Sequence, residues 1–231
     1  MKTKIILLPL LMSFSILSQA QSEHKLSELL DFVRTKKVIT GDWKNNLAEG
    51  EIEGSPYLNE TFTEGTVYTI QNDKYTGIPL RYNAYNDEIE FRNEKDEILA
   101  LYPPESIDKV EIGNLKMEYI PYIFAKNTRN GYFELIAKGN ASLFVKHEIV
   151  FKDAEEPGAY KEAAPARFVK NPDAYYIQIN NEPAEVVSNK KSLLEILSDQ
   201  YDEIDTFFKK NKIKTNNIDD LTKLIIYYNT L

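Results

Sequence analysis

The sequence predicts an α+β protein that is mainly β. We expect an antiparallel meander, arranged as a sandwich or an open barrel, followed by a small C-terminal β-hairpin with a helical cap. Between residues 66 and 113, apolar and polar side chains alternate with a period of two, as in half-buried antiparallel strands. Turn-forming residues separate several short runs of this kind. Beyond residue 190, by contrast, apolar side chains recur at helical spacing.

Residues 1–20 have the composition of a secretory signal peptide. Lys2 and Lys4 precede an apolar run from Ile5 to Leu17, and Ser18-Gln19-Ala20 offers small residues at the two positions that a signal peptidase inspects. This run is too short to span a bilayer as a helix, and no later apolar run is long enough. We therefore expect export to the periplasm, the outer-membrane periphery or the extracellular space.

Composition limits the chemistry that the chain can perform. Its 231 residues include no Cys, which excludes disulfides, thiolate zinc sites, thiol nucleophiles and a lipid anchor after the apolar run. The formal charge of −8 argues against a nucleic-acid partner, because phosphates require clustered Lys and Arg. Ordinary solubility, calcium binding or a basic partner could each account for this acidity.

The mature chain divides into four predicted segments. They are an N-terminal helix or arm with a loop (21–63), an antiparallel β body (64–152), a linker rich in Ala, Glu and Pro (153–173), and a hairpin with two or three helices (174–231). The first segment contains apolar residues at the i, i+3, i+4, i+7 spacing of a short amphipathic helix: Leu26, Leu29, Leu30 and Val33.

Turn residues set the predicted strand boundaries of the β body. We expect a hairpin at Asn72–Lys74, turns at Tyr85–Asp87 and Asn127–Gly131, and a break at Asn93–Asp96. The chain should leave the sheet at Tyr102–Pro104, because two prolines cannot donate ladder hydrogen bonds.

The C-terminal segment shows hairpin and helix signals. Tyr175–Ile179 and Ala184–Val187 flank a turn sequence, and Ser192 with Glu195 forms a capping-box pattern that predicts the start of a helix. Asn217 is the predicted cap of a last helix. Its apolar face would comprise Ile218, Leu221, Leu224, Ile225 and Tyr228.

Three stretches resemble a group of uncharacterised exported proteins of Bacteroidetes-type bacteria. They are Gly77–Phe91, Ile107–Gly113 and Asp220–Leu231. The resemblance covers most of the mature chain and implies a Gram-negative envelope setting. It implies no activity, cofactor or catalytic residue.

No residue pattern indicates a catalytic triad, a metal site or a cofactor. The chain has two histidines, His24 and His147, and it lacks a Gly-x-Ser-x-Gly elbow, an EF-hand loop and a phosphate-binding glycine loop. We interpret His147 as an ordinary strand-face histidine, because neighbouring strand residues such as Glu148 point to the opposite face. An atypical hydrolase using the carboxylate of Glu88 or Glu90 is an alternative, although alternating Glu is common on a solvated strand face.

Tyrosine is the most suggestive residue type, with 15 in the chain. Tyrosines on an exposed sheet can anchor a protein interface or stack on sugars, and half-buried strands also favour them. We predict a ligand- or partner-binding site at Tyr82 and Tyr85 with Arg81 and Asp87. The leading hypothesis is a non-enzymatic exported envelope protein that binds or scaffolds another protein through a Tyr-rich sheet face or edge. The alternatives are a glycan-binding module and the carboxylate-dependent hydrolase.

Overall fold

The computed structural model describes residues 23–24, 29, 36–37, 52–157 and 162–231. The strands of the N-terminal half are β1 (Glu23–His24), β2 (Lys36–Lys37), β3 (Ile52–Glu53), β4 (Thr63–Thr69), β5 (Lys74–Asn83), β6 (Glu88–Arg92), β7 (Ile98–Ala100) and β8 (Ile107–Ile112). Those that follow are β9 (Leu115–Phe124), β10 (Asn127–Ala137), β11 (Ala141–Lys146), β12 (Ile149–Lys152), β13 (Ala166–Lys170), β14 (Ala174–Ile179) and β15 (Glu185–Val186). The C-terminal helices are α3 (Lys190–Ile196), α4 (Tyr201–Asn211) and α5 (Ile218–Tyr228), with short 3₁₀ turns at Pro104–Ser106 and Ser198–Gln200.

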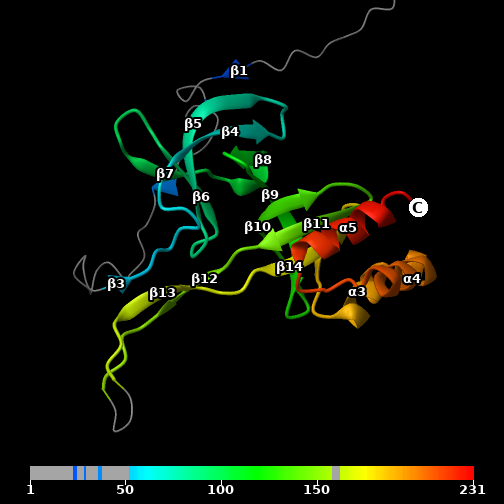
Figure 1. The fold of residues 1–231 in the computed structure, drawn as a ribbon. Coiled ribbons are helices and arrows are strands. Elements are labelled where there is room, and N and C mark those ends of the chain that lie inside the picture. The colour runs from blue at the N-terminus through cyan, green and yellow to red at the C-terminus, as the bar shows by residue number, and fades with distance from the viewer. Residues whose placement is uncertain (1–22, 25–28, 30–35, 38–51, 158–161) are drawn as a thin grey trace, which may run out of the picture.

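Most strands belong to one large curled sheet (Figure 1). Its order is β15-β14-β11-β10-β9-β8-β4-β5-β6-β7-β2, and β1 adds to β5 in parallel. All other pairings within it are antiparallel. The predicted class, mainly β with a helical C-terminal region, is confirmed.

Most predicted turns are confirmed, and residues in the left-handed region mark three of them. Asn72, Asp87 and Asp96 have φ values of 67°, 57° and 62°, which Asn and Asp tolerate better than most residues. The turn predicted at Asn127–Gly131 is wrong. The chain reverses at Ala125 and Lys126, both with positive φ, and residues 127–131 begin β10 instead.

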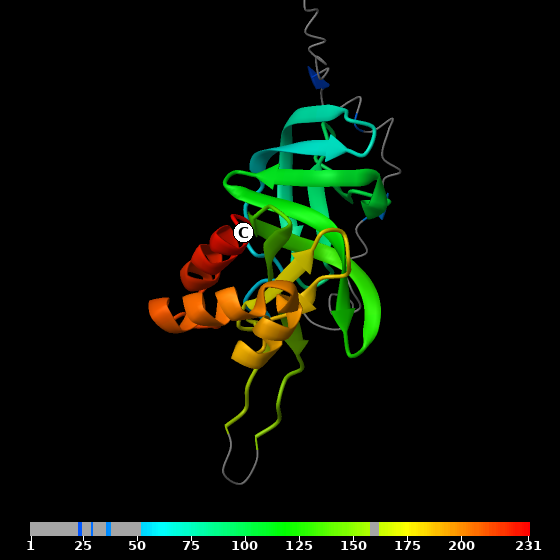
Figure 2. The same cartoon turned by 90° about the vertical axis from the view of Figure 1, so that its right-hand side faces the viewer.

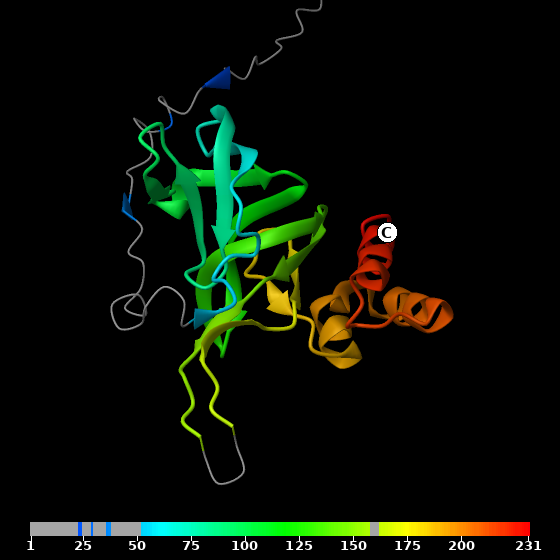
Figure 3. The same cartoon turned by 60° about the vertical axis from the view of Figure 1, so that its left-hand side comes forward.

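A second sheet lies beside the first in the order β12-β13-β3. Beyond β12 and β13 the two chain segments continue as a narrow arm that projects from the body (Figures 2 and 3). Glu155 and Ala164 exchange backbone hydrogen bonds of 2.8 and 3.0 Å within this arm. The prediction of a linker over residues 153–173 is therefore wrong. The segment forms an arm and a strand, and Pro157 and Pro165 lie outside the strands.

The C-terminal hairpin is confirmed but does not form a separate unit. β14 pairs along its whole length with β11, so the β14–β15 hairpin is the end of the large sheet. The predicted start of the first helix at Ser192 is wrong: Asn189 caps α3, and Ser192 completes the capping box from the third helical position. Asn217 caps α5 as predicted, by accepting a hydrogen bond from the amide of Asp220.

The buried residues form three clusters. One fills the inside of the curl and includes Ile78, Leu80, Ile89 and Phe91. The second lies between the helices and the face of β11 and β14, and buries the predicted apolar side of α5. The third packs aromatic rings on the opposite face of β10, β11 and β14.

The end of α5 is fixed to the sheet by Asn229. Its side-chain Oδ1 accepts a hydrogen bond from the backbone amide of Ala141, and its Nδ2 donates one to the carbonyl of the same residue, each at 2.9 Å. One side-chain amide thus pairs with a strand as a neighbouring peptide would.

The predicted signal peptide and most of the predicted helix within residues 21–38 lie outside the described residues. Leu29 is helical and buried in the first cluster. In the ranges that the structure describes, no helix has the length and apolar character needed to cross a membrane.

Candidate functional site

Tyr82 points into the curled sheet, not out of it. The alternation along β5 that buries Ile78 and Leu80 also buries Tyr82, which is 2% exposed. Its ring is therefore no platform for a ligand, and the expectation of a Tyr82 surface is corrected. Its hydroxyl nevertheless donates a 2.6 Å hydrogen bond to Oδ1 of Asp87.

Arg81 lies on the other face of β5 but is not available to a ligand either. Its guanidinium carbon lies 3.5 Å from the centre of the Tyr57 ring and 4.3 Å from that of Phe62. It forms a 2.7 Å ion pair with Glu90, which is the residue paired with Arg81 across the β5–β6 hairpin. Glu90 is fully buried and also accepts a hydrogen bond from Asn83. The expectation that Glu90 lies on a solvated strand face is wrong, because Tyr57 and Phe62 cover this face beside Arg81.

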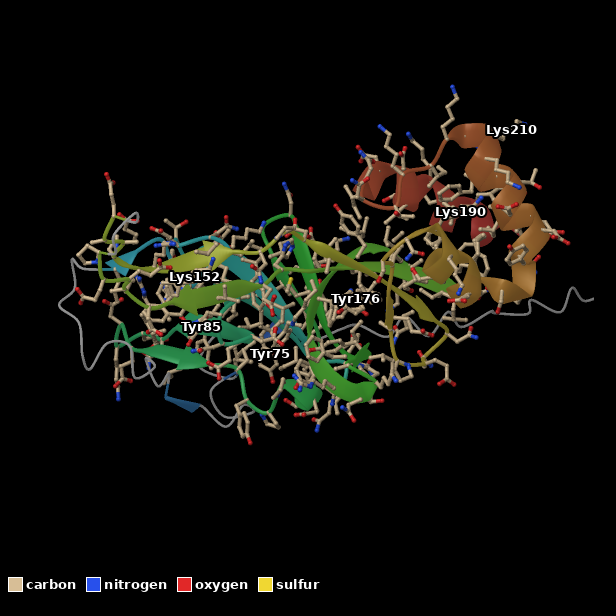
Figure 4. The ribbon with its side chains drawn as sticks, turned by 90° about the horizontal axis from the view of Figure 1, so that it is seen from below. Tyr75, Tyr85, Lys152, Tyr176, Lys190 and Lys210 are labelled. Atoms are coloured by element: carbon tan, nitrogen blue, oxygen red, sulfur yellow. The ribbon has the colours of Figure 1, made fainter. Side chains whose placement is uncertain are left out.

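Tyr85 is partly exposed and contacts the second sheet. Its ring packs edge-on against Phe168 of β13 at a centroid distance of 5.3 Å. In the side-chain view, Tyr85 lies in the same half of the molecule as Lys152 of β12, whereas Lys190 and Lys210 lie at the helical end (Figure 4). The structure therefore does not bring Tyr85, Arg81 and Asp87 together around one surface.

Of the four residues predicted to form a binding site, Asp87 is the one that binds side chains and backbone from several strands. One of its carboxylate oxygens lies 2.8 Å from Nζ of Lys146, and the carboxylate accepts from the hydroxyl of Tyr82 and the backbone amide of Tyr132. Lys146 also donates to the carbonyl of Tyr132 at 3.0 Å. We call Asp87, Tyr82, Tyr132 and Lys146 the Asp87 junction. It connects the β5–β6 turn to β10 and β11, which are distant in the order of the sheet.

Gly131 makes room for this junction. A Cβ atom at this position would lie 2.6 Å from Oδ2 of Asp87 and 2.9 Å from Nζ of Lys146. Real Cβ contacts are longer, so any side chain here would displace the ion pair.

A hollow of about 320 Å³ lies beside the Asp87 junction. We call it the tyrosine hollow. Its lining residues are Asn86, Asp87, Glu88, Ala100, Leu101, Tyr102, Pro104, Tyr119, Asn130 and Tyr132. They come from the β5–β6 turn, the end of β7 and the two long strands β9 and β10, so the curl of the sheet creates the hollow.

Tyr132 is the unusual member of this lining. It is 2% exposed, and its hydroxyl has no hydrogen-bond partner among the described residues. Burial, followed by the charge of Asp87, raises the pKa of Tyr132, so the phenol stays protonated at any physiological pH. Burial and the nearby carboxylate of Glu105 also raise the pKa of Tyr119.

His147 is not the strand-face histidine that we expected. It lies in the junction between β11 and β12, is 6% exposed, and is held between two carboxylates. Its Nδ1 lies 2.8 Å from Asp173 and its Nε2 lies 2.7 Å from Glu134. Burial alone would lower the pKa of His147, but the hydrogen bonds and charges of Glu134 and Asp173 outweigh this effect and raise it. With both ring nitrogens occupied, the imidazole has no atom with which to act as a base on a substrate.

The carboxylate-dependent alternative depended on Glu88 and Glu90. Glu90 is fully buried and is paired with Arg81, so a substrate cannot reach it. Glu88 lines the tyrosine hollow. In the described residues no group of three or more His, Asp or Glu side chains is placed to hold a metal ion.

Comparison with known proteins adds no relative. The chain matches no protein-family model, no curated protein and no solved structure. The site must therefore be interpreted from its own geometry.

Proposed function

We propose that this chain is a non-enzymatic protein exported to the cell envelope, where it binds another protein through the tyrosine hollow. The observation that carries this proposal is the hollow itself, with Tyr102 and Tyr119 in its lining and the Asp87 junction holding its walls. Tyrosine rings give a large contact area for little loss of side-chain entropy. The signal-like residues 1–20 and the resemblance to exported envelope proteins support the location.

A binding role suits the way in which reactive side chains are used. The imidazole of His147 is fixed by two carboxylates, and Glu90 is committed to Arg81 and Asn83. Groups held in this way stabilise a sheet and do not exchange protons with a bound molecule.

The hollow is a better candidate for the contact surface than the sheet edges. In the ranges that the structure describes, the strands at the two ends of the large sheet, β15 and β2, each have two residues. Such short edges offer a partner few backbone groups to pair with, so strand addition has little to build on.

Glycan binding is the second candidate. The phenol rings of Tyr102 and Tyr119 share the hollow with the amide side chains of Asn86 and Asn130. Aromatic faces pack on the apolar faces of sugar rings, and amides bond to their hydroxyls.

Affinity capture from envelope extracts tests the leading proposal. The exported chain should repeatedly recover one partner in stoichiometric amount, identified by mass spectrometry. The variant Tyr102→Ser should lose that partner, because Tyr102 is 46% exposed and lines the hollow. Tyr201→Ser is the matched control, since Tyr201 is 50% exposed but lies at the start of α4.

Recovery of nothing, or of the same partner with Tyr102→Ser, would exclude the hollow as a protein-binding surface. A glycan array then tests the second candidate. Binding that is lost in both Tyr102→Ser and Tyr119→Ser but kept in Tyr201→Ser supports it, and a flat response to envelope and dietary glycans removes it.

A further inference from the structure

The end of the β9–β10 hairpin extends beyond the part of the sheet that holds its base. Residues 124–130, which we call the hairpin tip, are all exposed, and the pairing of β10 with β11 begins only beyond them. The hairpin is braced directly behind its tip. The amide of Ile123 donates to the carbonyl of Ala184, and the amide of Ala184 donates to the carbonyl of Pro121, each at 2.9 Å. A braced base holds the tip in a fixed direction.

The hairpin tip is basic, in contrast to the rest of the chain. About one residue in six is acidic, 36 of 231, yet none of residues 119–133 is. Lys126 and Arg129 lie in this stretch, and in the described part of the chain neither forms a salt bridge. Glu118, next to the stretch, is already paired with Lys138 at 2.7 Å. The two positive charges of the tip therefore favour an anionic partner.

The same tip exposes apolar surface. Phe124 is 45% exposed, and the guanidinium carbon of Arg129 lies 4.6 Å from the centre of its ring. The two turn residues, Ala125 and Lys126, have φ values of 48° and 68°, a conformation that usually selects Asn and Gly. The sequence thus places an alanine and a lysine where Asn and Gly would be less strained. Strained positions of this kind are frequent at binding sites.

Apolar and charged groups are layered along the hairpin as a membrane interface requires. Phe124 and Ala125 lie at the end, and Arg129 is paired with Tyr122, two residues or about 7 Å behind Phe124. Interfacial segments bury their apolar side chains about 5–10 Å deep, so Arg129 and Tyr122 would lie at the level of the headgroups. Lys126 is in the turn, but its long stem lets the ammonium reach back to the phosphates. An acidic protein surface would match the charges alone, whereas an anionic membrane matches both the charges and the apolar end.

We propose that the hairpin tip docks this protein on an anionic membrane surface. Phe124 enters the headgroup layer, and Lys126 and Arg129 bind lipid phosphates. One aromatic side chain and two cations give weak and reversible binding, which keeps the protein beside the membrane without anchoring it. This inference does not rest on the proposed function, because none of these three residues lines the tyrosine hollow.

Flotation with lipid vesicles tests the proposal. The exported chain is used without residues 1–20, because their apolar run would bind vesicles by itself. It should bind vesicles of equal parts phosphatidylglycerol and phosphatidylcholine about tenfold or more tightly than vesicles of phosphatidylcholine alone, since each cation near an anionic surface contributes about fivefold. Added salt should weaken the binding to anionic vesicles. Absence of binding, or equal binding to both vesicles, would overturn the proposal.

Two double variants test the charges. Lys126→Gln with Arg129→Gln should weaken binding to anionic vesicles about tenfold or more. Arg92→Gln with Lys95→Gln is the matched control, because it removes the same net charge from exposed positions at the β6–β7 turn. Arg92 also stacks on a phenylalanine ring at 4.6 Å, as Arg129 does. The control should bind vesicles like the wild type, and an equal loss in both double variants would contradict a role for the tip.

Phe124→Ser tests the apolar contact. It should weaken binding to anionic vesicles about tenfold or more, because the exposed part of the ring no longer leaves water. Ile70→Ser is the control, since it removes a 63% exposed side chain from the β4–β5 turn, and it should have no effect. Unchanged binding by Phe124→Ser would show that the ring does not enter the membrane.

A single fluorophore reports the orientation, because the chain has no Cys of its own. A nitrobenzoxadiazole label on Ala125→Cys should brighten and shift to shorter wavelength when anionic vesicles are added. The same label on Gln71→Cys, at an exposed position of the β4–β5 turn, should not respond. A response at residue 71 and none at residue 125 would mean that another face meets the lipid.

The outcomes separate this inference from the proposed function. Tyr102→Ser should keep vesicle binding, and Phe124→Ser should keep a partner that is captured through the tyrosine hollow. If the wild type binds no vesicle and Phe124→Ser loses a captured partner, the tip contacts a protein and the membrane inference is wrong. If vesicles bind through the tip but no partner is captured, the membrane contact stands and protein binding through the hollow fails.

Discussion

Nζ of Lys146, at the end of β11, lies 2.8 Å from a carboxylate oxygen of Asp87 in the β5–β6 turn. Five strands, β6 to β10, lie between the two residues in chain order, and four strands separate β5 from β11 in the sheet, so this ion pair joins parts of the curl that the pairing of neighbouring strands does not bring together. Both side chains are largely shielded from solvent, at 15% and 30% exposure. Removing one partner of such a shielded pair costs more than breaking a surface salt bridge, because it leaves the other charge without a counter-ion.

Removing the charge of Asp87 should destabilise the protein. Asp87→Asn preserves the left-handed backbone and a hydrogen-bond acceptor but leaves Lys146 without its counter-ion. We expect a loss of about 1–3 kcal/mol in the free energy of unfolding, measured by urea denaturation. Asp96→Asn is the matched control, because Asp96 also has a positive φ but forms a solvent-exposed pair with Arg92. A change of equal size in both variants would contradict a special role for the Asp87 junction.

The pairing of His147 with Glu134 and Asp173, which we call the His147 clasp, should make stability depend on pH. Its folded pKa is raised above the unfolded value of about 6.5, so its contribution is complete below that pH and is lost as pH rises through the folded pKa. The pKa of Asp173 is lowered despite burial, chiefly by its hydrogen bond with His147, so its contribution disappears as pH falls through the folded value, below about 3.9. Stability from this clasp should therefore be greatest between about pH 4 and 6.5.

Urea denaturation at a series of pH values measures this effect. The free energy of unfolding of the wild type should fall as pH rises above about 6.5, and His147→Gln should remove that slope. His24→Gln should keep it. If the slope instead disappears in His24→Gln, the assignment to His147 is wrong.

The buried Arg81–Glu90 pair should be strongly coupled. Glu90→Gln leaves a guanidinium enclosed by Tyr57 and Phe62 without a counter-charge, and we expect a loss of about 2–4 kcal/mol. A double-mutant cycle with Arg81→Met should give a coupling energy above about 1 kcal/mol, because the second change removes the unpaired charge. Additive single effects would show that the two residues act separately.

The attachment of α5 to β11 should depend on both the oxygen and the nitrogen of the Asn229 side-chain amide. Asn229→Ala removes two hydrogen bonds to the backbone of Ala141 and should lower the free energy of unfolding by about 1–3 kcal/mol. Asn229→Asp should be at least as damaging, since a carboxylate oxygen would face the Ala141 carbonyl. Asn211→Ala, which removes an exposed side-chain bond to Phe207, should change stability by less than about 0.5 kcal/mol.

Local sequence patterns predicted the positions of the strands well, but they did not predict which distant segments and side chains contact those strands. The period-two alternation located β5 and β6, and the turn at Tyr85–Asp87 sets the register that places Arg81 opposite Glu90. That pairing could have been predicted, but the segment that covers it could not, because Tyr57 and Phe62 lie in a loop without periodicity.

The site residues that sequence reasoning missed come together only through long-range topology. β11 pairs with β10 on one side and with β14 on the other, although β12 and β13 separate β11 from β14 in the chain. These pairings place Lys146 near Asp87 and His147 near Asp173. The expected separate C-terminal unit failed for the same reason. Gly131 offered the one local signal, because a glycine inside a strand often marks a position where other atoms approach the backbone closely.

The amide of Asn229 also determines how the fold would respond to mechanical force. A pull on Leu231 would be transmitted through Asn229 to Ala141, and so into the interior of the sheet, before it reached α3 or α4. In an optical-tweezers experiment, the two hydrogen bonds between Asn229 and Ala141 should therefore break first, and the helices should detach from the sheet only afterwards.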